Sequence, residues 1–478
     1  MPSPDQFAYM DALDLASLVR QKQVQPIELV DAVISRIERL NPTLNAVVTP
    51  MYDEARRRAQ EPLPEGPLSG VPFLLKDFLA EYAGVRMTEG SRFLSDFVPD
   101  EDSELVKRIK LAGLITVAKT NTPALACGPT TEPQLFGAAH NPWDTNRTTG
   151  GSSGGAGASV ASGIVSIAHG NDAGGSIRIP ASCCGVFGLK PTRGRNPLGP
   201  LYGDIFSGFV SEHVLTRSVR ESAAFLDASS GPDLGDPYAT PPPDRPFLEE
   251  VGASPGRLRI AYSGQTTLGT PLDPDCAAAL QDAVTLCAEL GHEVVEASPD
   301  FDGEEVWQGF VKVCAAGFAW VVDDWARRTG RTPTEADFEP FVWAYTMRGR
   351  EISAPEYLMI TQDLQKMTRS VARFHQQYDI WLTPTLGQPP VDLGHFAFNS
   401  GDDPIEMRRR MAEFSPFTFI TNGTGQPSAS IPLYWNGQGL PIGVHMAARY
   451  GDEATIFRLA SQLEEARPWK DRRPPIAV

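Results

Sequence analysis

The sequence predicts a mixed α/β fold, in which a largely parallel central sheet is flanked by helices and an N-terminal helical layer is added. Three observations lead to this class. Strand-like apolar segments alternate with helix-like segments between residues 68 and 200, and such alternation is typical of a parallel sheet covered on both faces. The first sixty residues have helical spacing instead. A further strand–helix–strand series begins at residue 258.

The N-terminal layer, residues 1–60, is predicted from its amphipathic segments. Pro26 can occupy the first position of a helix. Behind it, apolar residues recur at helical spacing, namely Val30, Val33, Ile37 and Leu40. Asn41-Pro42 is expected to end that helix, because the residue before a proline avoids the helical conformation.

Residues 68–200 form the predicted core of alternating strands and helices. Asp102-Ser103 can cap a helix that ends at Gly113, and residues 114–118 then have the composition of a strand. The Pro- and Gly-rich segment 231–257 predicts a long surface connection.

Residues 258–478 are expected to complete the sheet, to carry helical insertions and to end in a hairpin and a helix. Strands are expected at 258–262, 293–296 and 379–382, a helix at 273–290, and a hairpin turn at 435–439. No internal repeat is visible, so we interpret residues 1–478 as a single domain.

Composition excludes several classes of function. The chain has 478 residues and a net charge of −17, which argues against nucleic acid or an anionic membrane as a partner. No basic start followed by an apolar core suggests a signal peptide, and no apolar run approaches the roughly 18 residues that span a bilayer. The six cysteines form no CxxC pair and the seven histidines are scattered, so we expect no metal site. Reduced thiols and a cytoplasmic location are the simplest expectation.

One lysine and two serine–glycine clusters indicate the chemistry. Lys76 follows the apolar run GVPFLL at residues 70–75, GGSSGG occupies residues 150–155, and DAGGSIRIP occupies residues 172–180. A serine needs a neighbouring base to become a nucleophile. A lysine can be that base when burial keeps it neutral. The set therefore indicates acyl transfer without a histidine.

These motifs resemble the amidase signature family, whose members hydrolyse amides through a Ser–cis-Ser–Lys triad. The resemblance is carried by the stretch from Thr149 to Pro191, by GVPFLLKD around Lys76, and by GQPSASIP at residues 425–432. It extends from about residue 8 to about residue 467. The runs TTEPQLFGAAHNPWD and AHGNDAGGSIRIPASCCG are most similar to the 6-aminohexanoate-cyclic-dimer hydrolase branch. The family has an α/β/α fold and uses no cofactor.

The resemblance implies a role for each member of the triad. Ser176 would be the nucleophile that carries the acyl group, Ser152 the bridging serine after a cis peptide bond, and Lys76 the base. Backbone amides on small residues can approach a substrate and form an oxyanion hole. The expected donors are the amides of Ala173, Gly174, Gly175 and Ser176.

Other residues receive supporting roles. Asp172 and Arg178 flank the nucleophile and are expected to form a structural pair. The residues predicted to contact substrate are Cys127, Gly128, Thr130, Gly151 and Cys314. For the two thiols, small buried apolar side chains are an equally good interpretation. The aromatic residues predicted to pack in the core are Trp307, Phe310, Phe318 and Trp320. Thr148-Thr149 stands where many relatives have proline before GGSSG, which puts the rigidity of that loop in question.

Two alternatives remain open from the sequence. GGSSG also matches the G-x-S-x-G elbow of α/β-hydrolases, with Ser152 as nucleophile and His213, His375 or His445 as base. That interpretation leaves the motif at residues 172–180 unexplained. The other alternative is the A subunit of a tRNA-dependent amidotransferase, which has this fold and triad and works with partner subunits.

The expected partner is a small-molecule amide, and a homodimer is expected. Linear amides, cyclic oligoamides, aryl amides, esters and carbamates all remain open as substrates.

Overall fold

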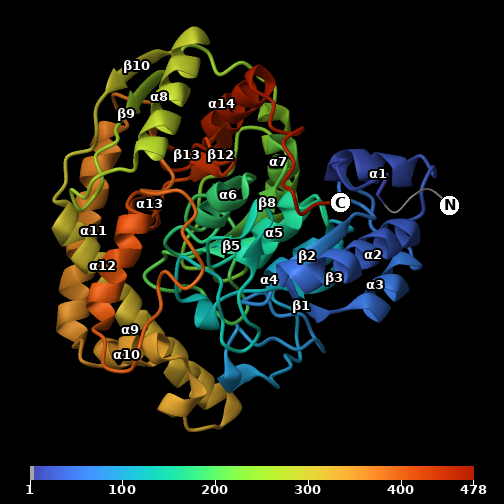
Figure 1. The fold of residues 1–478 in the computed structure, drawn as a ribbon, viewed down its shortest axis with the longest axis horizontal. Helices are drawn as coiled ribbons and strands as arrows, with labels where there is room; N and C mark the ends of the chain where they lie inside the picture. The colour runs from blue at the N-terminus through green and yellow to red at the C-terminus, as the bar shows by residue number, and fades with distance from the viewer. Residues whose placement is uncertain (1–4) are drawn as a thin grey trace.

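The computed structural model describes residues 5–478 and places one large mixed sheet at the centre (Figure 1). In the described chain the order of its eleven strands is β1-β3-β2-β6-β8-β7-β12-β13-β11-β9-β10. A separate small hairpin is formed by β4 and β5. The strands are β1 (Val47–Pro50), β2 (Pro72–Lys76), β3 (Ile115–Thr120), β4 (His140–Asn141), β5 (Asp144–Thr148), β6 (Ile167–Asp172), β7 (Phe187–Lys190), β8 (Ser211–Thr216), β9 (Arg259–Tyr262), β10 (Glu293–Glu296), β11 (Ile380–Pro384), β12 (Ser428–Trp435) and β13 (Pro441–Ala448).

Helices cover both faces and both ends of this sheet, which confirms the predicted mixed α/β class; four of the ten strand pairings in the described sheet are parallel. They are α1 (Ala12–Arg20), α2 (Pro26–Leu44), α3 (Tyr52–Ala59), α4 (Glu104–Leu111), α5 (Gly154–Ala161), α6 (Arg178–Cys184), α7 (Val219–Ser229), α8 (Pro274–Glu289), α9 (Gly303–Thr329), α10 (Pro340–Arg350), α11 (Ala354–Phe374), α12 (Pro404–Phe414), α13 (Thr418–Thr424) and α14 (Glu453–Ala466). Helices α1–α3 lie at one end of the molecule, and α9–α12 form a layer at the opposite end (Figure 1).

Strand directions are mixed in a regular way. The run β3–β2–β6 and the run β11–β9–β10 are parallel. The strands between these two runs pair antiparallel, from β6 through β8, β7, β12 and β13 to β11. The two parallel runs are the strand–helix alternations that the sequence predicts. The antiparallel centre joins them.

The N-terminal layer differs from the prediction in two ways. Helix α2 continues through Pro42 to Leu44, because a proline near the end of a helix removes only one hydrogen bond and Asn45 caps the end in a left-handed conformation. The layer also contains a strand. Residues Val47–Pro50 form β1, which pairs antiparallel with β3 at the edge of the sheet.

Helix α5 is built almost entirely from small residues, and all eight of them are buried. A side chain at Gly155 would lie 2.4 Å from the carbonyl oxygen of Ala46 and 2.5 Å from the amide nitrogen of Asn121. These distances are shorter than any normal contact. The run GGAGASVA therefore lets a helix lie directly against the neighbouring backbone.

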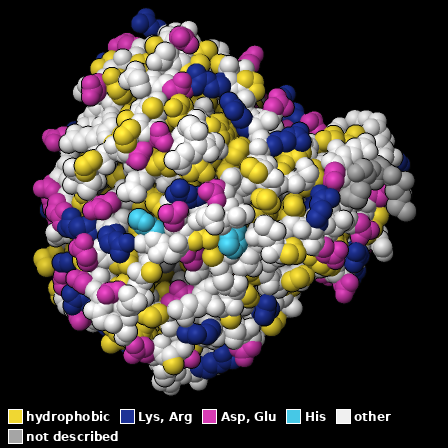
Figure 2. All heavy atoms as spheres, in the orientation of Figure 1, with side chains coloured by type: hydrophobic (Ala, Val, Ile, Leu, Met, Phe, Trp, Pro, Cys, Tyr) yellow, Lys and Arg dark blue, Asp and Glu magenta, His cyan; other side chains and the backbone are white. Residues whose placement is uncertain are grey.

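The remaining segments follow their sequence patterns. Helix α4 is capped by the side chain of Ser103, and α8 ends just before Gly291, which has a φ of 93°. The segment 231–257 runs over the surface, although Phe247 is buried. Within residues 5–478, no helix combines the length and apolarity needed to cross a membrane. Acidic and basic side chains are interspersed over the face drawn in Figure 2.

Candidate active site

The predicted base and the predicted nucleophile loop meet at one edge of the sheet. Strands β2 and β6 are parallel neighbours, with Leu74 opposite Ala168. Carboxyl ends of adjacent parallel strands lie together, which is where open α/β sheets place their sites. Lys76 is the last residue of β2, and Asp172 is the last residue of β6.

Lys76 is fully buried, and both hydrogen-bond partners of its Nζ are neutral. Its Nζ donates hydrogen bonds to Ser152 Oγ at 2.7 Å and to Asn171 Oδ1 at 2.6 Å. Removal from water disfavours the charged amine and lowers the pKa of Lys76 to about 7, although Glu212 and Asp172 oppose that shift. A substantial fraction of this side chain is therefore neutral at physiological pH.

Asn171 fixes the orientation of the lysine, and we did not single it out from the sequence. Its Nδ2 donates to the carbonyl oxygen of Phe78 at 3.3 Å. Because that carbonyl only accepts, the amide oxygen must face Lys76. Asn171 therefore occupies one N–H of the amine and leaves the contact with Ser152 for proton exchange. Its place beside Asp172 in the second motif is the signal that could have identified it.

The loop that carries Ser152 is held by threonine side chains. The Gly151–Ser152 peptide bond is cis, as the resemblance implies. The amide of Gly150 donates to Thr148 Oγ1 at 3.0 Å, and Thr131 Oγ1 donates to the carbonyl of Gly150 at 2.9 Å. These hydroxyls fix the loop without the proline that many relatives have before GGSSG.

Ser176 lies on the turn between β6 and α6 and is half-buried. The amide of Gly175 donates to Asp172 Oδ1 at 2.7 Å, so it is already engaged. Within residues 5–478, the amides of Ala173, Gly174 and Ser176 donate to no other group. Of the four predicted oxyanion donors, these three remain free to face a substrate.

Asp172 and Arg178 form the expected pair, and both are fully buried. Arg178 donates to both carboxylate oxygens, at 2.9 and 2.8 Å. Although burial opposes the charge on Asp172, this guanidinium and the amide of Asn422 hold the pKa of Asp172 well below its usual range. The carboxylate also receives the amides of Gly175 and Ile177, so it orders the backbone on both sides of Ser176.

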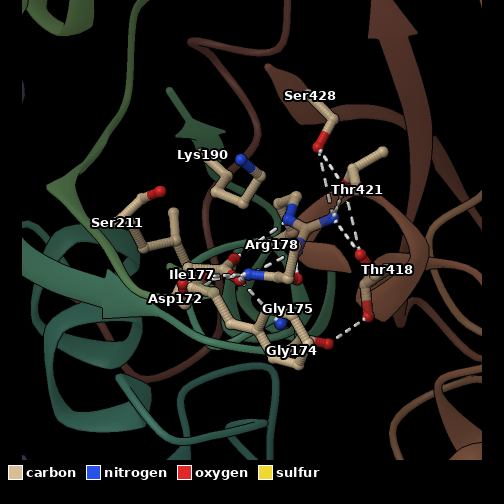
Figure 3. A network of polar contacts seen from close by, with 12 residues as sticks. Asp172, Gly174, Gly175, Ile177, Arg178, Lys190, Ser211, Thr418, Thr421 and Ser428 are labelled. Carbon is tan, nitrogen blue, oxygen red and sulfur yellow. Dashed lines mark hydrogen bonds and ion pairs between the residues drawn. The ribbon is translucent and has the colours of Figure 1, made fainter. Parts of the chain in front are cut away.

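The same guanidinium joins the nucleophile turn to the C-terminal part of the chain. Figure 3 shows Arg178 between Asp172 on one side and residues of α13 and β12 on the other. Arg178 donates to the carbonyl of Thr418 at 2.7 Å and to Ser428 Oγ at 3.2 Å. Thr418 Oγ1 in turn donates to the carbonyl of Gly174 at 2.6 Å. The GQPSASIP segment is thus part of the support of this turn.

Ser152 and Ser176 line one cavity of about 110 Å³. Three of the five predicted contact residues also line it, namely Cys127, Gly128 and Cys314. Thr130 and Gly151 are not among the lining residues. They pack against each other instead, because a side chain at Gly151 would lie 2.4 Å from the carbonyl oxygen of Thr130. Their close packing keeps the Ser152 loop in place.

The far wall of the cavity comes from α9 and α12. The aromatic residues that were predicted to pack in the core all line the cavity, namely Trp307, Phe310, Phe318 and Trp320. Three of them are buried as predicted, but the prediction was wrong for Trp320, which is 40% exposed. Helical spacing cannot distinguish a buried face that packs on protein from one that borders a cavity. The wall also includes Trp325 and Arg408, which no sequence motif marks.

Glu89 is a buried acid in the same cavity. Burial raises the pKa of Glu89 to about 8, against a hydrogen bond of 2.9 Å from Trp325 Nε1 that favours the charged form. It is therefore mainly a neutral carboxylic acid at pH 7. The triad does not contact it through any hydrogen bond in residues 5–478.

Asp77 follows Lys76 directly in the sequence but does not form an ion pair with it. The ion pair of Asp77 is with Lys119 on β3, at 3.5 Å. Thr88 donates its amide and its hydroxyl to the other carboxylate oxygen of Asp77. The nearest acid in sequence is thus bound elsewhere.

The three histidines of the elbow alternative have partners outside the Ser152 loop. His213 contacts Ser222 Oγ at 2.7 Å. His375 contacts the carbonyl of Tyr378, and His445 contacts Arg178. The side-chain partner of Ser152 is Lys76. This geometry does not support a serine–histidine pair at Ser152.

Comparisons with known proteins agree with this geometry. The family model described as Amidase matches residues 28–457. The 6-aminohexanoate-cyclic-dimer hydrolase of Paenarthrobacter ureafaciens is 37% identical over 480 residues, which cover 98% of this chain and 97% of that protein. The acylamidase of Rhodococcus erythropolis is 32% identical, with coverage of 98% and 97%.

Solved structures also differ in how similar they are to this chain. A structure of 6-aminohexanoate cyclic dimer hydrolase complexed with substrate has a TM-score of 0.93 at 36% identity, and the match covers 98% of this chain and 100% of that chain. A glutamyl-tRNA(Gln) amidotransferase component from Thermotoga maritima, its A subunit, has a TM-score of 0.78 at 26% identity, with coverage of 98% of both chains. The amidotransferase alternative is therefore the more distant of the two.

Proposed function

This chain belongs to the amidase family, and from that premise we propose that it cleaves small linear or cyclic oligoamides with Ser176 as nucleophile, Ser152 as proton relay and Lys76 as base. That it hydrolyses carboxylic amide C–N bonds follows from the family and from its full-length relatives. The assignment of the three residues and the substrate class are the proposal.

The first half of the reaction forms a tetrahedral intermediate on Ser176. Neutral Lys76 accepts the proton of Ser152 across their 2.7 Å contact, while Ser152 accepts the proton of Ser176. The oxygen of Ser176 attacks the amide carbonyl. The negative charge that develops on the carbonyl oxygen is stabilised by the free amides on the turn at residues 173–176.

The second half returns the enzyme to its starting state. The relay gives its proton to the amide nitrogen, the C–N bond breaks and the amine leaves, while the acyl group stays on Ser176. Water then loses a proton to the same relay and attacks the ester carbon. The acid is released and Ser176 recovers its proton.

One observation carries this assignment. A buried lysine with no acidic partner at its nitrogen is bonded to Ser152, and both serines open onto one cavity. A buried lysine without counter-charge is costly unless it is neutral. The site therefore provides a base at physiological pH in a place where water is scarce.

The substrate class is supported by the cavity and by the relatives. Its wall is largely aromatic, aliphatic and sulfur-containing, which suits the methylene chains of oligoamides. Among the similar proteins, two are named as hydrolases of a cyclic amide dimer, and another is an acylamidase.

The test is hydrolysis of four compounds by the purified chain, namely an aryl acylamide, a cyclic ω-amino-acid dimer, a simple carbamate and glutamine. We expect turnover of at least one of the first two. Ser176→Ala and Lys76→Ala should each lower kcat by at least about 10³-fold, since members of a triad act as a unit.

Ser153→Ala is the matched control. Ser153 is buried in the same loop, but its hydroxyl contacts the carbonyl of Asn171 rather than Lys76. It should retain most of the activity. Turnover that survives Ser176→Ala would refute the nucleophile. A folded wild type that hydrolyses none of the four compounds alone, but is active with added partner subunits and a charged tRNA, would support the amidotransferase alternative.

A further inference from the structure

Helix α12 carries three consecutive arginines that have different surroundings. Arg409 pairs with Glu304 at 2.6 Å and stacks on Trp307. Arg410 is exposed and donates to the carbonyl of His395 at 2.7 Å. Arg408 alone of the three lines the cavity that holds Ser152 and Ser176.

The polar neighbours of Arg408 are all uncharged. Its guanidinium lies 5.0 Å from the ring centre of Tyr345, and the Tyr345 hydroxyl and the Cys314 thiol are neighbouring neutral groups. The Tyr345 hydroxyl donates to the carbonyl of Val311, so it can only accept from Arg408. One N–H contacts the sulfur of Met411 at 3.9 Å. Across residues 5–478, Arg408 forms no ion pair with a carboxylate.

An arginine remains charged in proteins, so this cation has no compensating anion inside the cavity wall. Among the described lining residues, the side chain with a carboxyl group is Glu89, and it is mainly protonated at pH 7. Withdrawing a charge from water without a partner is unfavourable. An incoming carboxylate would supply the partner and could bind the guanidinium through two parallel hydrogen bonds.

We propose that Arg408 is a specificity residue that binds a carboxylate of the substrate, so that the preferred substrates are amides bearing a free carboxylate at one end of a flexible chain. This inference rests on the proposed function, because it assumes that the cavity at Ser176 receives the amide. Cys127 and Cys314 then form the neutral floor beside the cation. The apolar wall of α9 contacts the methylene chain between the carboxylate and the scissile bond.

Two series of substrates test the assignment. In the first, the carboxylate is in the acyl part, as in monoanilides of dicarboxylic acids with three to eight carbons, each compared with the neutral anilide of equal chain length. In the second, it is in the amine part, as in N-hexanoyl ω-amino acids, each compared with the N-alkyl hexanamide of equal length. The measured quantity is the ratio of kcat/KM between the charged and neutral members.

In the wild type we expect the charged member to be favoured by about 10- to 100-fold at one chain length, which is the range for a hydrogen bond to a charged group. Arg408→Gln should reduce that ratio to about 1 and leave kcat/KM for the neutral member within about threefold. Arg410→Gln changes the same residue type two positions away and should behave as the wild type does.

Arg408→Lys covers the possibility that Arg408→Gln does not fold. It keeps the charge but cannot bind a carboxylate through a planar fork, so the preference should fall while neutral turnover persists. The proposal is overturned if no charged member is favoured in either series, or if the preference survives both substitutions. If even neutral anilides are not hydrolysed by a folded wild type, the proposed function fails first and this inference fails with it.

Discussion

The cavity is bounded by two walls that are built in opposite ways. The signature wall, residues 70–200, contains a polar network with Arg178 at its centre, and Asp172 and four further side chains are the partners of that guanidinium. The opposite wall, from α9 to α12, is mostly apolar, and its cation Arg408 has only neutral neighbours.

The two arginines show what this difference means, since Arg178 is fully buried and Arg408 is partly buried. A guanidinium with every donor occupied fixes the backbone around it, as Arg178 does for the turn of Ser176. A guanidinium without a carboxylate is held ready for a ligand. The same residue type is therefore structural in one wall and available for recognition in the other.

The strongest test of the comparison is the stability of Arg178→Met against Arg408→Met. Removing Arg178 leaves the buried carboxylate of Asp172 without its partner, so we expect the free energy of unfolding to fall by about 3–5 kcal/mol. Arg408→Met removes an uncompensated charge and should change stability by less than about 1 kcal/mol. Urea unfolding followed by tryptophan fluorescence measures both. Equal decreases in the free energy of unfolding would show that both arginines stabilise the fold to the same extent, which would contradict the comparison.

The signature wall also predicts how activity depends on pH. Lys76 acts as a base only when neutral, and burial lowers its pKa to about 7. For a neutral substrate, kcat/KM should rise about tenfold per pH unit below 7 and level off above it. A profile from pH 5 to pH 9 measures this. Arg408→Gln should have the same inflection, because the two cations lie in different walls. A profile that is flat through pH 7 would contradict Lys76 as the base.

The smallest expected effect is that of substituting Glu89, which lines the cavity but forms no hydrogen bond with the triad in the described residues. Its pKa is about 8, against an ordinary value of 4.5, so the folded state holds a proton that the unfolded state has lost between these values. The contribution of Glu89 to stability should therefore fall as pH rises from about 4.5 to about 8, and Glu89→Gln should remove that contribution. The fall due to Glu221 and Glu464, whose pKa values burial raises to about 7, should remain in the variant. Thermal unfolding of the wild type and of Glu89→Gln, each at pH 5 and pH 8, measures this difference. At pH 7 we expect turnover within about threefold of the wild type.

Much of the fold and the pairing of the chemical groups could be predicted from the sequence. Strand β10 was expected at residues 293–296 and occupies Glu293–Glu296, because local apolar patterns decide short strands in a strand–helix–strand unit. Lys76 and Ser152 were expected to interact across 76 positions, and they do so at 2.7 Å. Motifs that determine backbone conformation can be recognised without knowing the rest of the chain.

The opposite wall could not be predicted in the same way. Nothing in the run Arg408–Arg410 distinguishes the arginine that faces the cavity from the two that face outward, since that depends on how α12 is rotated against α9 and α10. The predicted end of α2 at Asn41-Pro42 was wrong for a similar reason. The side chain of Asn41 binds the backbone of Val47, which lies beyond the helix, and so supports the chain after Pro42.

The small-residue helix α5 has a consequence for how such an enzyme can diversify. In a library containing every single substitution, positions within Gly154–Ala161 should yield almost no active variants larger than the original residue, since all eight residues are buried and neighbouring atoms already occupy the space beside Gly154 and Gly155. Positions on α12 that face the cavity should yield many active variants. New substrate preferences can therefore arise by selection on one wall, while the hydrolytic residues are inherited unchanged.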